Sequence, residues 1–450
     1  MAERRTTYLI QDPYDLDAVQ FIRTIDLDYG IRPICLYTST KDRFYGELDF
    51  PILTSDLIEA SIDVEPDDLS SVVEQLGEYD VCGVVPYRED TVEVAAELCE
   101  LLGLGWNSPE TLRRFRDKFE QKTYLREIDP TIRVPECRLI ATADDLIAGA
   151  LPERYVLKPN DGLGNRSIGM FGADGLAAAR AHLDRESGPF ILEEFIGGIE
   201  YHIDGQVRGE GDVESLAVYE YVRTEVNGYP TVYLGELLCP TTDPRFDQLV
   251  DYADRLLTAT GLRRCPFHLE VKVDDEGPCL VDLGARLPSE GGGRTISRLH
   301  PGRPDAYAIA AHDYLGINAV ATGPIDWTAY DRARTVLVYG VSEEVGLIAS
   351  VGGVEAVEAM PEFVRWAVKP GVGDPLVATT DLRGAPFIVE LSCVGDRSDA
   401  LALMDEVRSL VTWNVDAGRR AAEIARVGST ARRARRKLHW LLHQRMHGAR

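Results

Sequence analysis

Short apolar runs alternate with amphipathic stretches at the start of the chain. The apolar runs are residues 6–10, 33–37 and 81–86, and the helix-like stretches are residues 16–27, 68–76 and 90–102. Such alternation predicts a small parallel α/β domain of Rossmann-like type over residues 1–108. Asn107-Ser108-Pro109 closes this domain, because a serine cap followed by proline is typical of the first turn of a new helix.

The hydrophobic pattern changes after Gly323-Pro324. Four short strand-like segments separated by turns follow, and residues 399–410 then have helical periodicity. This succession predicts a small C-terminal α+β domain over residues 326–415, followed by a basic helical tail at residues 416–450.

Length and composition narrow the class of protein. The chain has 450 residues, 45% of them hydrophobic, which is enough for about three domains with their own cores. No apolar run approaches the ~20 residues that a membrane span needs, and the N-terminus enters a strand-like segment without a leader. Eight cysteines without CxxC spacing indicate buried free thiols in a reducing cytosol, so a cytoplasmic protein is expected.

The charge is strongly acidic but uneven. A net charge of −26 argues against general nucleic-acid binding. Residues 1–110 carry 24 acids and 7 bases, interpreted as a solvated surface, whereas residues 419–450 carry 10 bases and one acid. In this tail His439, His443 and His447 recur every four residues. An amphipathic helix that is solvated or contacts a subunit is the favoured interpretation, and a transition-metal site is the alternative.

The stretch 155–171, YVLKPNDGLGNRSIGMF, carries the first candidate chemistry. An apolar strand ends in Lys158, a glycine-rich loop follows, and a second apolar strand returns. Glycines let backbone N–H groups approach a polyphosphate, and basic side chains neutralise its charge. The loop is not a Walker A motif, because GxxxxGK[ST] is absent. Its candidate phosphate-binding residues are Gly162, Gly164, Asn165, Arg166 and Ser167.

Two later acidic stretches complete an ordered set of motifs. Residues 190–207 read FILEEFIGGIEYHIDGQV, and residues 267–296 read FHLEVKVDDEGPCLVDLGARLPSEGGGRTI. With the lysine and glycine-rich loop before them, they resemble the ATP-grasp superfamily of carboxylate–amine ligases over residues 80–320. The set is most similar to the L-amino-acid ligases, which join two amino acids.

The resemblance implies a division of the chain. Residues 109–325 would form the ATP-grasp core, with a lid subdomain at about residues 130–195. Residues 1–108 would then be the pre-ATP-grasp domain that packs beside the nucleotide site, and the small C-terminal α+β domain would follow the core.

The resemblance also assigns phosphate contacts to two lysines. Lys158 matches the lysine on the strand before the glycine-rich loop. The family's earlier lysine follows an aspartate in a helix, which matches Lys118, yet Lys122 fits equally well when counted backward from Val134-Pro135. The choice stays open, with Lys118 favoured.

The EEFI segment and the residues after it are matched to the nucleoside. Four residues match the hinge that pairs with the adenine edge: Glu193, Glu194, Phe195 and Ile196. Glu200 matches the glutamate that binds the ribose. In a strand of period two, His202 and Asp204 lie on the face of Glu200, where His202 would approach the phosphates or the substrate. A satisfied core histidine is the alternative.

Glu270 and Asp282 are the metal candidates. Each lies in an apolar strand-like run, and the two runs are joined by a turn, so a hairpin can place both carboxylates on one side. Acids among apolar residues are costly unless they bind a cation, and Mg²⁺ suits carboxylate and phosphate oxygens. Gly284 stands where many superfamily members have a further asparagine ligand, so one or two Mg²⁺ ions, with Mn²⁺ as a substitute, are expected.

Arg286 and Arg294 are the catalytic candidates. A guanidinium can hold the γ-phosphate and later an acyl phosphate or oxyanion through two hydrogen bonds. Residues 289–294 form a loop whose N–H groups would cradle a carboxylate or oxyanion, with a surface turn as the alternative. His268 and Lys272 flank Glu270 on its face, where they would tune its charge or form buried polar pairs.

The predicted activity is an ATP-dependent carboxylate–amine ligase. It would form an amide or peptide bond through an acyl phosphate, release ADP and phosphate, and use amino acids or a related small acid and amine. The alternatives are an ATP-grasp carboxylase acting on a purine precursor or biotin, and a non-catalytic ATP-binding module. Residues 221–233 and 294–303 are interpreted as pocket-forming loops. Neither nucleic acid nor membrane is expected as a partner, and a homodimer is the default.

Overall fold

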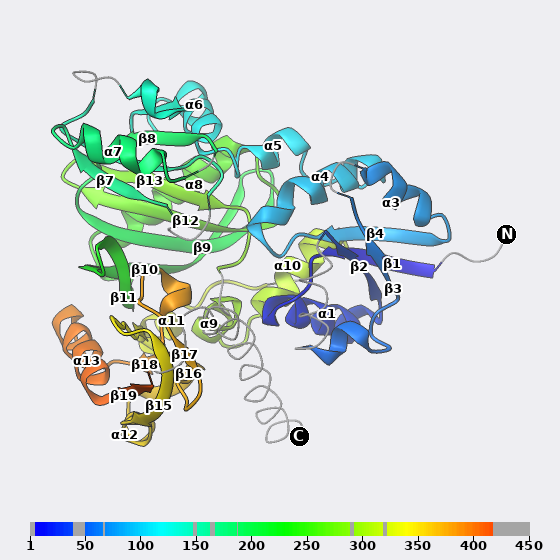
Figure 1. The fold of residues 1–450 in the computed structure, drawn as a ribbon. Coiled ribbons are helices and arrows are strands. Elements are labelled where there is room, and N and C mark those ends of the chain that lie inside the picture. The colour runs from blue at the N-terminus through cyan, green and yellow to red at the C-terminus, as the bar shows by residue number, and fades with distance from the viewer. Residues whose placement is uncertain are drawn as a thin grey trace. The chain divides into compact units, whose positions relative to one another are not determined.

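The computed structural model describes residues 5–38, 50–65, 68–146, 151–162, 167–186, 188–288, 292–317 and 322–416 (Figure 1). The chain divides into two compact units. The first contains residues 1–43, 52–218 and 239–329, and the second contains residues 44–51, 219–238 and 330–450. The division predicted from the sequence, at residues 108, 325 and 415, stays a prediction.

A four-stranded parallel sheet opens the first unit. Its order is β3 (Ala60–Asp63), β2 (Arg32–Tyr37), β1 (Arg5–Gln11) and β4 (Tyr79–Val85). The apolar runs of β1, β2 and β4 are the strands expected from the sequence, and the predicted parallel α/β domain is confirmed. The edge strand β3 was not predicted, because it has only four residues, all half-buried or exposed, and its two apolar residues, Ala60 and Ile62, are not adjacent.

Helices cover this parallel sheet. Its own helices are α1 (Leu16–Tyr29), α3 (Leu69–Gln75) and α4 (Val92–Leu101), with short 3-10 turns η1 (Pro51–Thr54) and η2 (Glu89–Thr91). The Asp15 side chain caps α1 by accepting hydrogen bonds from two backbone N–H groups, and Gly30 ends the helix at a φ of 64°. Helix α10 (Ala306–Leu315), far away in sequence, packs against α1 and β4.

A second sheet of the first unit is antiparallel. Its order is β5 (Cys137–Ile140), β8 (Phe190–Glu194), β6 (Arg154–Pro159) and β7 (Gly169–Gly172). Helix α7 (Leu176–Leu183) packs on β7, and the 3-10 turn η3 (Ala143–Asp145) lies beside α7. Tyr155, Leu157, Phe190 and Leu192 form the core beneath the helix. Lys158 and Glu193 lie on adjacent strands of this sheet, two positions apart in the register.

The third sheet region of the first unit is β13 (Gly277–Gly284), β12 (Cys265–Asp274) and β9 (Ile199–Gly209), with antiparallel pairs. Helix α8 (Phe246–Thr260) packs against β9 and β13. The helices α5 (Pro109–Arg113), α6 (Lys118–Ile128) and α9 (Gly292–Leu299) complete the described part of this unit. The prediction of a loop over residues 294–303 is wrong at its start, where α9 runs with Ile296 and Leu299 buried.

Strand β10 (Asp212–Val226) passes from the first unit into the second, where β11 (Tyr229–Leu238) pairs with it. The interpretation of residues 221–233 as a loop is wrong. They form a hairpin with a two-residue turn, in which Asn227 and Gly228 have φ values of 54° and 76°. Asn-Gly is the sequence signal for such a turn, because both central positions need positive φ.

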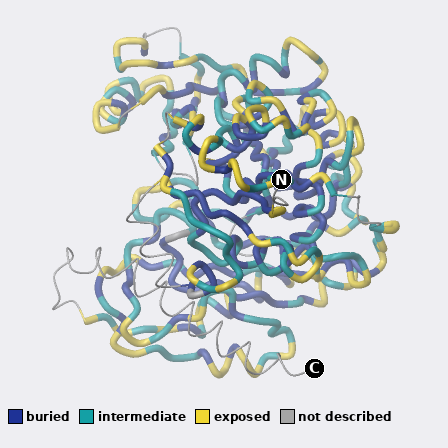
Figure 2. The backbone as a smooth tube through the Cα atoms, turned by 90° about the vertical axis from the view of Figure 1, so that its right-hand side faces the viewer, coloured by how far each residue is buried: buried dark blue, intermediate teal, exposed yellow. Residues whose placement is uncertain are grey.

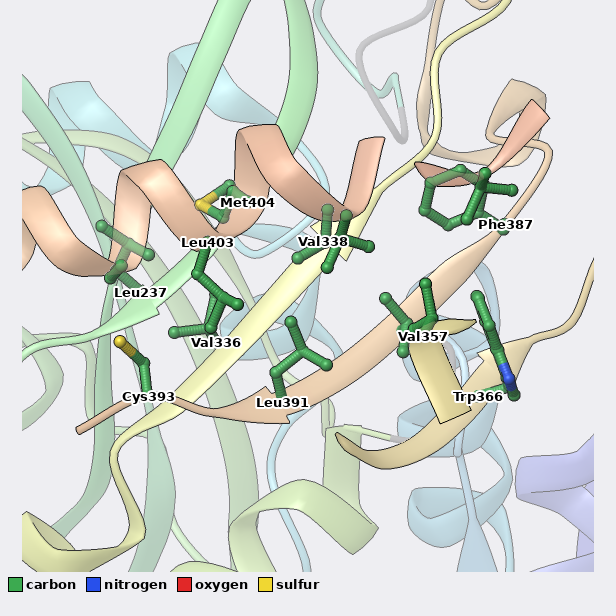
Figure 3. Close-up of a cluster of buried hydrophobic side chains, with 14 of the residues drawn as sticks. Leu237, Val336, Val338, Val357, Trp366, Phe387, Leu391, Cys393, Leu403 and Met404 are labelled. Atoms are coloured by element: carbon green, nitrogen blue, oxygen red, sulfur yellow. The ribbon is translucent and has the colours of Figure 1, made fainter. Parts of the chain in front are cut away.

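The second unit continues with mostly antiparallel strands. Its larger sheet runs β11, β14 (Thr335–Tyr339), β18 (Ile388–Ser392) and β16 (Phe363–Val368). A smaller sheet runs β17 (Pro375–Leu376), β15 (Gly346–Gly352) and β19 (Thr412–Asp416). Its helices are α12 (Val354–Glu358) and α13 (Arg397–Leu410), with the 3-10 turn η4 (Leu382–Gly384), and α11 (Trp327–Ala333) leads in from the first unit. Met404 of α13 packs with Leu237, Val338 and Leu391 of the sheet (Figure 3).

Burial follows the strands in both units. Figure 2 shows buried backbone along the strands and exposed backbone at turns and outer helix faces. All eight cysteines are free thiols, six of them buried. Within the described ranges, no helix is long and apolar enough to cross a membrane.

Candidate active site

A row of polar side chains crosses one face of the sheet formed by β9, β12 and β13. Glu270 on β12 lies opposite His202 on β9 and opposite Asp282 on β13. The register of β12 and β13 shifts after Glu270, where Val271 pairs with Leu280. Because directly opposed residues share a face, the two carboxylates lie side by side, as a Mg²⁺ ion with oxygen ligands requires.

Three buried lysines converge on the acids at this sheet. The Lys118 Nζ lies 3.1 Å from Asp282 Oδ1. Glu193, at the end of β8, is shared: Lys122 Nζ lies 3.0 Å from its Oε1, and Lys158 Nζ lies 2.9 Å from its Oε2. Lys122 is 0% exposed and Lys158 is 5% exposed, so each charge depends on these partners. Both candidates for the earlier lysine thus belong to one cluster, and the choice between them as phosphate ligand stays open.

The backbone carbonyl of Val281 on β13 ties two of these lysines to the metal-candidate strand. It accepts hydrogen bonds from Lys158 Nζ at 2.8 Å and from Lys122 Nζ at 3.3 Å. Lys118 Nζ donates instead to the Gly162 carbonyl at 3.2 Å, at the start of the glycine-rich loop. The loop and the acidic hairpin are therefore joined through ammonium groups.

Burial and charge shift these groups in defined directions. Burial acts to raise the pKa of Asp282, but Lys118, Lys158 and Lys122 outweigh it and hold this pKa far below its ordinary value. The pKa of Glu193 is likewise lowered, because Lys122 and Lys158 outweigh its burial. Burial lowers the pKa of Lys122, whereas for Lys158 the opposing attraction of Glu193 and Asp282 raises the pKa. The carboxylates are thus held ionised in a buried cluster.

The predicted phosphate loop is described only at its two ends. Gly162 accepts from Lys118, as above, and Ser167 Oγ donates to Glu186 Oε2 at 2.7 Å. Gly164, Asn165 and Arg166 lie outside the described residues. Their phosphate-binding role stays a prediction.

The predicted adenine hinge follows β8. The Glu194 carboxylate accepts a hydrogen bond from the Glu136 N–H at 2.9 Å, which links the end of β8 to the residue before β5. The Phe195 ring lies under the Arg154 guanidinium, 3.6 Å from its carbon to the ring centroid. The adenine contacts of all four hinge residues stay predictions.

Lys272 links the hinge to the predicted ribose site. Its Nζ donates to the Ile196 carbonyl at 3.3 Å and lies 3.9 Å from Glu200 Oε2. Glu200 and Lys272 are opposed across β9 and β12, two positions from the His202–Glu270 pair. Glu200 thus lies in the same polar row, as its predicted role requires.

His202 and His268 share one carboxylate. Asp204 Oδ2 accepts from His202 Nδ1 at 2.9 Å, and Asp204 Oδ1 accepts from His268 Nδ1 at 2.6 Å. Burial acts to lower the pKa of His268, but Asp204 outweighs it and raises the pKa. On its other side, His268 Nε2 lies 3.5 Å from Glu270 Oε1. The histidines therefore belong to the polar row beside the metal candidates.

Glu89 is a site residue that the sequence analysis did not select. Arg286 reaches its Oε2 with Nε and Nη2, each at 3.0 Å, and Arg116 Nη1 lies 3.3 Å from its Oε1. Glu89 is 6% exposed, whereas the acidic front was interpreted as solvated surface. A usable signal existed, because Glu89 follows β4 and ligands of parallel sheets bind beyond the carboxyl ends of the strands.

Arg294, the other catalytic candidate, contacts the parallel-sheet region. Its Nη2 donates to Gln20 Oε1 of α1 at 3.1 Å. Ser289, Glu290 and Gly291, from the predicted oxyanion loop, lie outside the described residues. The role of Arg294 stays a prediction.

The fold and the matched domain define the class of the protein. Residues 175–290 match the family model described as ATP-grasp domain, and this range contains Glu193, Glu270, Asp282 and Arg286. The chain has the ATP-grasp fold, with a parallel-sheet domain before it. The predicted fold class is confirmed.

Relatives and solved structures give the particular likenesses. The chain is 22% identical to the protein y4rH of Sinorhizobium fredii over 81% of this chain and 76% of that protein. It is 22% identical to dapdiamide A synthase of Enterobacter agglomerans over 50% of this chain, and 23% identical to human carnosine synthase 1 over 60%. The matches span 55% and 35% of those two synthases.

Among solved structures, an L-amino acid ligase from Bacillus licheniformis superposes with a TM-score of 0.72 at 16% identity, covering 92% of this chain and 100% of that one. A biotin carboxylase domain from Hydrogenobacter thermophilus superposes with a TM-score of 0.62 at 13% identity, covering 92% of each chain. At these identities the structures establish the fold.

Proposed function

We propose that the protein is an ATP-dependent carboxylate–amine ligase that joins amino acids, or a related small acid and amine, and releases ADP and phosphate. The arrangement that carries the proposal is the cluster of three buried lysines that contact Glu193 of β8 and Asp282 of β13. Phosphoryl transfer depends on positioning and on neutralising spread negative charge, which is what such a cluster supplies.

Each charged group has a task in this proposal. Lys158 and one of Lys118 and Lys122 exchange carboxylate partners for phosphate oxygens when the nucleotide binds. Glu270 and Asp282 would hold Mg²⁺, and a bound Mg²⁺ would supply positive charge next to the phosphates. The carboxylate pair fits this ion, because both donors are hard oxygens in direct cross-strand register.

The reaction follows from these charges in two steps. A carboxylate oxygen of the first substrate attacks the γ-phosphorus, the bond to the ADP oxygen breaks, and an acyl phosphate forms. The lone pair of an amine then attacks the acyl carbon, the carbon–oxygen bond to phosphate breaks, and the amine proton leaves to solvent or phosphate. In this proposal Arg286 stabilises the phosphoryl oxygens and then the tetrahedral oxyanion. The lid excludes water from the hydrolysable anhydride.

A phosphate-release screen of amino-acid pairs tests the proposal. We expect release only with ATP, Mg²⁺ and a productive acid–amine pair, together with a condensed product by mass spectrometry. Hydroxylamine in place of the amine should yield a hydroxamate from the acyl phosphate. Glu270→Ala should abolish release while the fold stays intact, and full activity of this variant would remove Glu270 from the metal role.

An ATP-grasp carboxylase is the second candidate, since a biotin carboxylase domain shares the fold. Phosphate release that depends on bicarbonate and not on an amine would favour it. ATP binding without phosphate release, under every mixture of acids, amines and bicarbonate, would instead favour a non-catalytic module.

A further inference from the structure

Two histidines beside Glu270 are not explained by Mg²⁺ and ATP alone. Within the part of the chain that the structure describes, His202, Asp204 and His268 form the group in which ligand atoms of three such residues lie within 4.8 Å of one another. His202 and Asp204 alternate along β9, and His268 lies opposite Asp204 on β12. All three side chains therefore share the face of Glu270.

Asp204 sets the orientation of both imidazoles. Its two oxygens accept the Nδ1–H groups of His202 and His268 at 2.9 and 2.6 Å, and Asp204 is 1% exposed. A histidine that binds a metal almost always donates its other ring N–H to a carboxylate or carbonyl in this way. The arrangement assigns Nε2 of each ring as the nitrogen for an outside ligand.

Glu270 supplies an oxygen beside Nε2 of His268, and it lies on the same face as His202. Its Oε1 lies 3.5 Å from His268 Nε2, and Glu270 is directly opposite His202. His268 in turn lies opposite Gly284, which has no side chain to compete for the same space. Two imidazoles and one carboxylate on a single face suit Mn²⁺, Fe²⁺, Co²⁺ or Zn²⁺, whereas Mg²⁺ prefers oxygen ligands alone.

We propose that His202, His268 and Glu270 form a transition-metal site that shares Glu270 with the Mg²⁺ site, with Asp204 as the positioning residue for both rings. This deepens the proposed function, since it makes the second metal position of the ligase a mixed nitrogen–oxygen site. Metal binding itself is independent of turnover, so the two proposals fail separately.

Co²⁺ titration of the chelator-treated full chain tests the site, because ligand-field absorption reports nitrogen ligands directly. His439, His443 and His447 of the tail are a second histidine cluster, so the titration uses a background in which all three are glutamine. We expect one Co²⁺ per chain and a visible absorption band in this background. Absence of binding by Co²⁺, Mn²⁺ and Zn²⁺ alike would overturn the proposal.

Three variants and a control locate the ion. His202→Gln and His268→Gln should each weaken Co²⁺ binding at least about tenfold, and Asp204→Asn should weaken it about 10–100-fold by releasing the rings. His312→Gln, which changes a histidine of α10, should leave the band and affinity unchanged. Unchanged Co²⁺ binding in the His202→Gln/His268→Gln double variant would overturn the site.

The outcomes separate folding, metal binding and ligase activity. Circular dichroism and melting temperature report whether each variant folds, and Zn²⁺ binding by calorimetry gives a second readout for any variant with altered absorption. Co²⁺ binding that depends on both histidines in a protein without ligase activity would uphold the metal site and refute the proposed function. Ligase activity with Mg²⁺, in a protein whose Co²⁺ binding does not change when both histidines are replaced, would uphold the proposed function and refute the metal site.

Discussion

The two compact units bury charge in different ways. In the second unit, Glu390 is 0% exposed and lies 2.6 Å from the Arg365 guanidinium, while the single Nε–H of Arg397 is shared between both carboxylate oxygens of Glu220. In the first unit, Lys122 and Lys158 share the single carboxylate of Glu193, and Lys118 adds a third ammonium at Asp282.

The difference distinguishes charged pairs that stabilise the fold from a charged cluster suited to binding a ligand. An arginine matched to a buried carboxylate satisfies it in every state of the protein. Three ammonium groups crowded on two carboxylates repel one another, and a polyanion relieves that repulsion. We therefore expect that removing a lysine of this cluster in the first unit affects ATP-dependent phosphate release. Removing one partner of an arginine–carboxylate pair in the second unit should affect stability instead.

Lys158→Met should have the largest effect. Loss of an ammonium group aimed at the transferred phosphoryl should lower kcat for phosphate release by about 10²–10³-fold. Any loss of stability should stay below the roughly 3–5 kcal/mol of a buried carboxylate left without a cation, because Glu193 keeps Lys122 as a partner. Steady-state kinetics measure kcat, and urea denaturation measures stability. Wild-type activity of Lys158→Met would contradict a functional role for this charge cluster.

Arg365→Met should show the reverse pattern. It leaves the buried Glu390 carboxylate without this arginine, which costs about 3 kcal/mol, at the low end for a buried pair because Arg365 is itself 28% exposed. ATP-dependent phosphate release at low temperature should stay at the wild-type level. Lys369→Met removes an ion pair whose two side chains are 38% and 34% exposed and should cost less than about 1 kcal/mol.

Lys118→Met and Lys122→Met should resolve which lysine contacts phosphate. We expect Lys118→Met to raise the KM for ATP about tenfold more than Lys122→Met, since one hydrogen bond to a charged group is worth about 1.5–3 kcal/mol. Lys122 is 0% exposed and forms an ion pair with Glu193, whereas Lys118 donates a hydrogen bond to the carbonyl of Gly162 at the start of the glycine-rich loop. Equal effects on KM would leave both lysines as phosphate ligands.

A pH effect on stability should be the smallest. Glu193 and Asp282 have lowered pKa values in the folded protein, so their stabilisation is present above the unfolded pKa of about 4 and is lost as the pH falls through the folded pKa. The melting temperature of Asp282→Asn should therefore decline less steeply in acid than that of wild type. Asp275→Asn, at an exposed turn, should follow wild type; a matching decline in Asp282→Asn would contradict the charge account.

The sequence predicted the elements better than the contacts between them. Apolar runs predicted β1, β2 and β4, whereas β3 was missed because it is a four-residue edge strand without a continuous apolar run. Residues 221–233 were interpreted as a loop although Asn227-Gly228 marks a hairpin. The apolar pattern thus located strands, but the Asn-Gly turn that joins two of them was missed.

In the candidate site, too, the sequence predicted which residues share a strand face but not which residues from different elements contact one another. Period two placed His202 with Glu200 and His268 with Glu270 on common faces, but their shared partner Asp204 follows from the register between β9 and β12, which a single sequence does not encode locally. Glu89 reaches Arg286 across 197 positions of sequence, and neither residue carries a local sign of the other. Long-range pairing was the part that required the structure.

Calorimetric titration with MgATP tests the central claim most directly, because it measures whether the lysine-rich cluster receives the nucleotide. Wild type and Arg365→Met should bind MgATP with the same affinity, and Lys158→Met should bind it at least about tenfold more weakly. Equal MgATP affinity in Lys158→Met and wild type would show that the cluster is a structural charge network and not the nucleotide site.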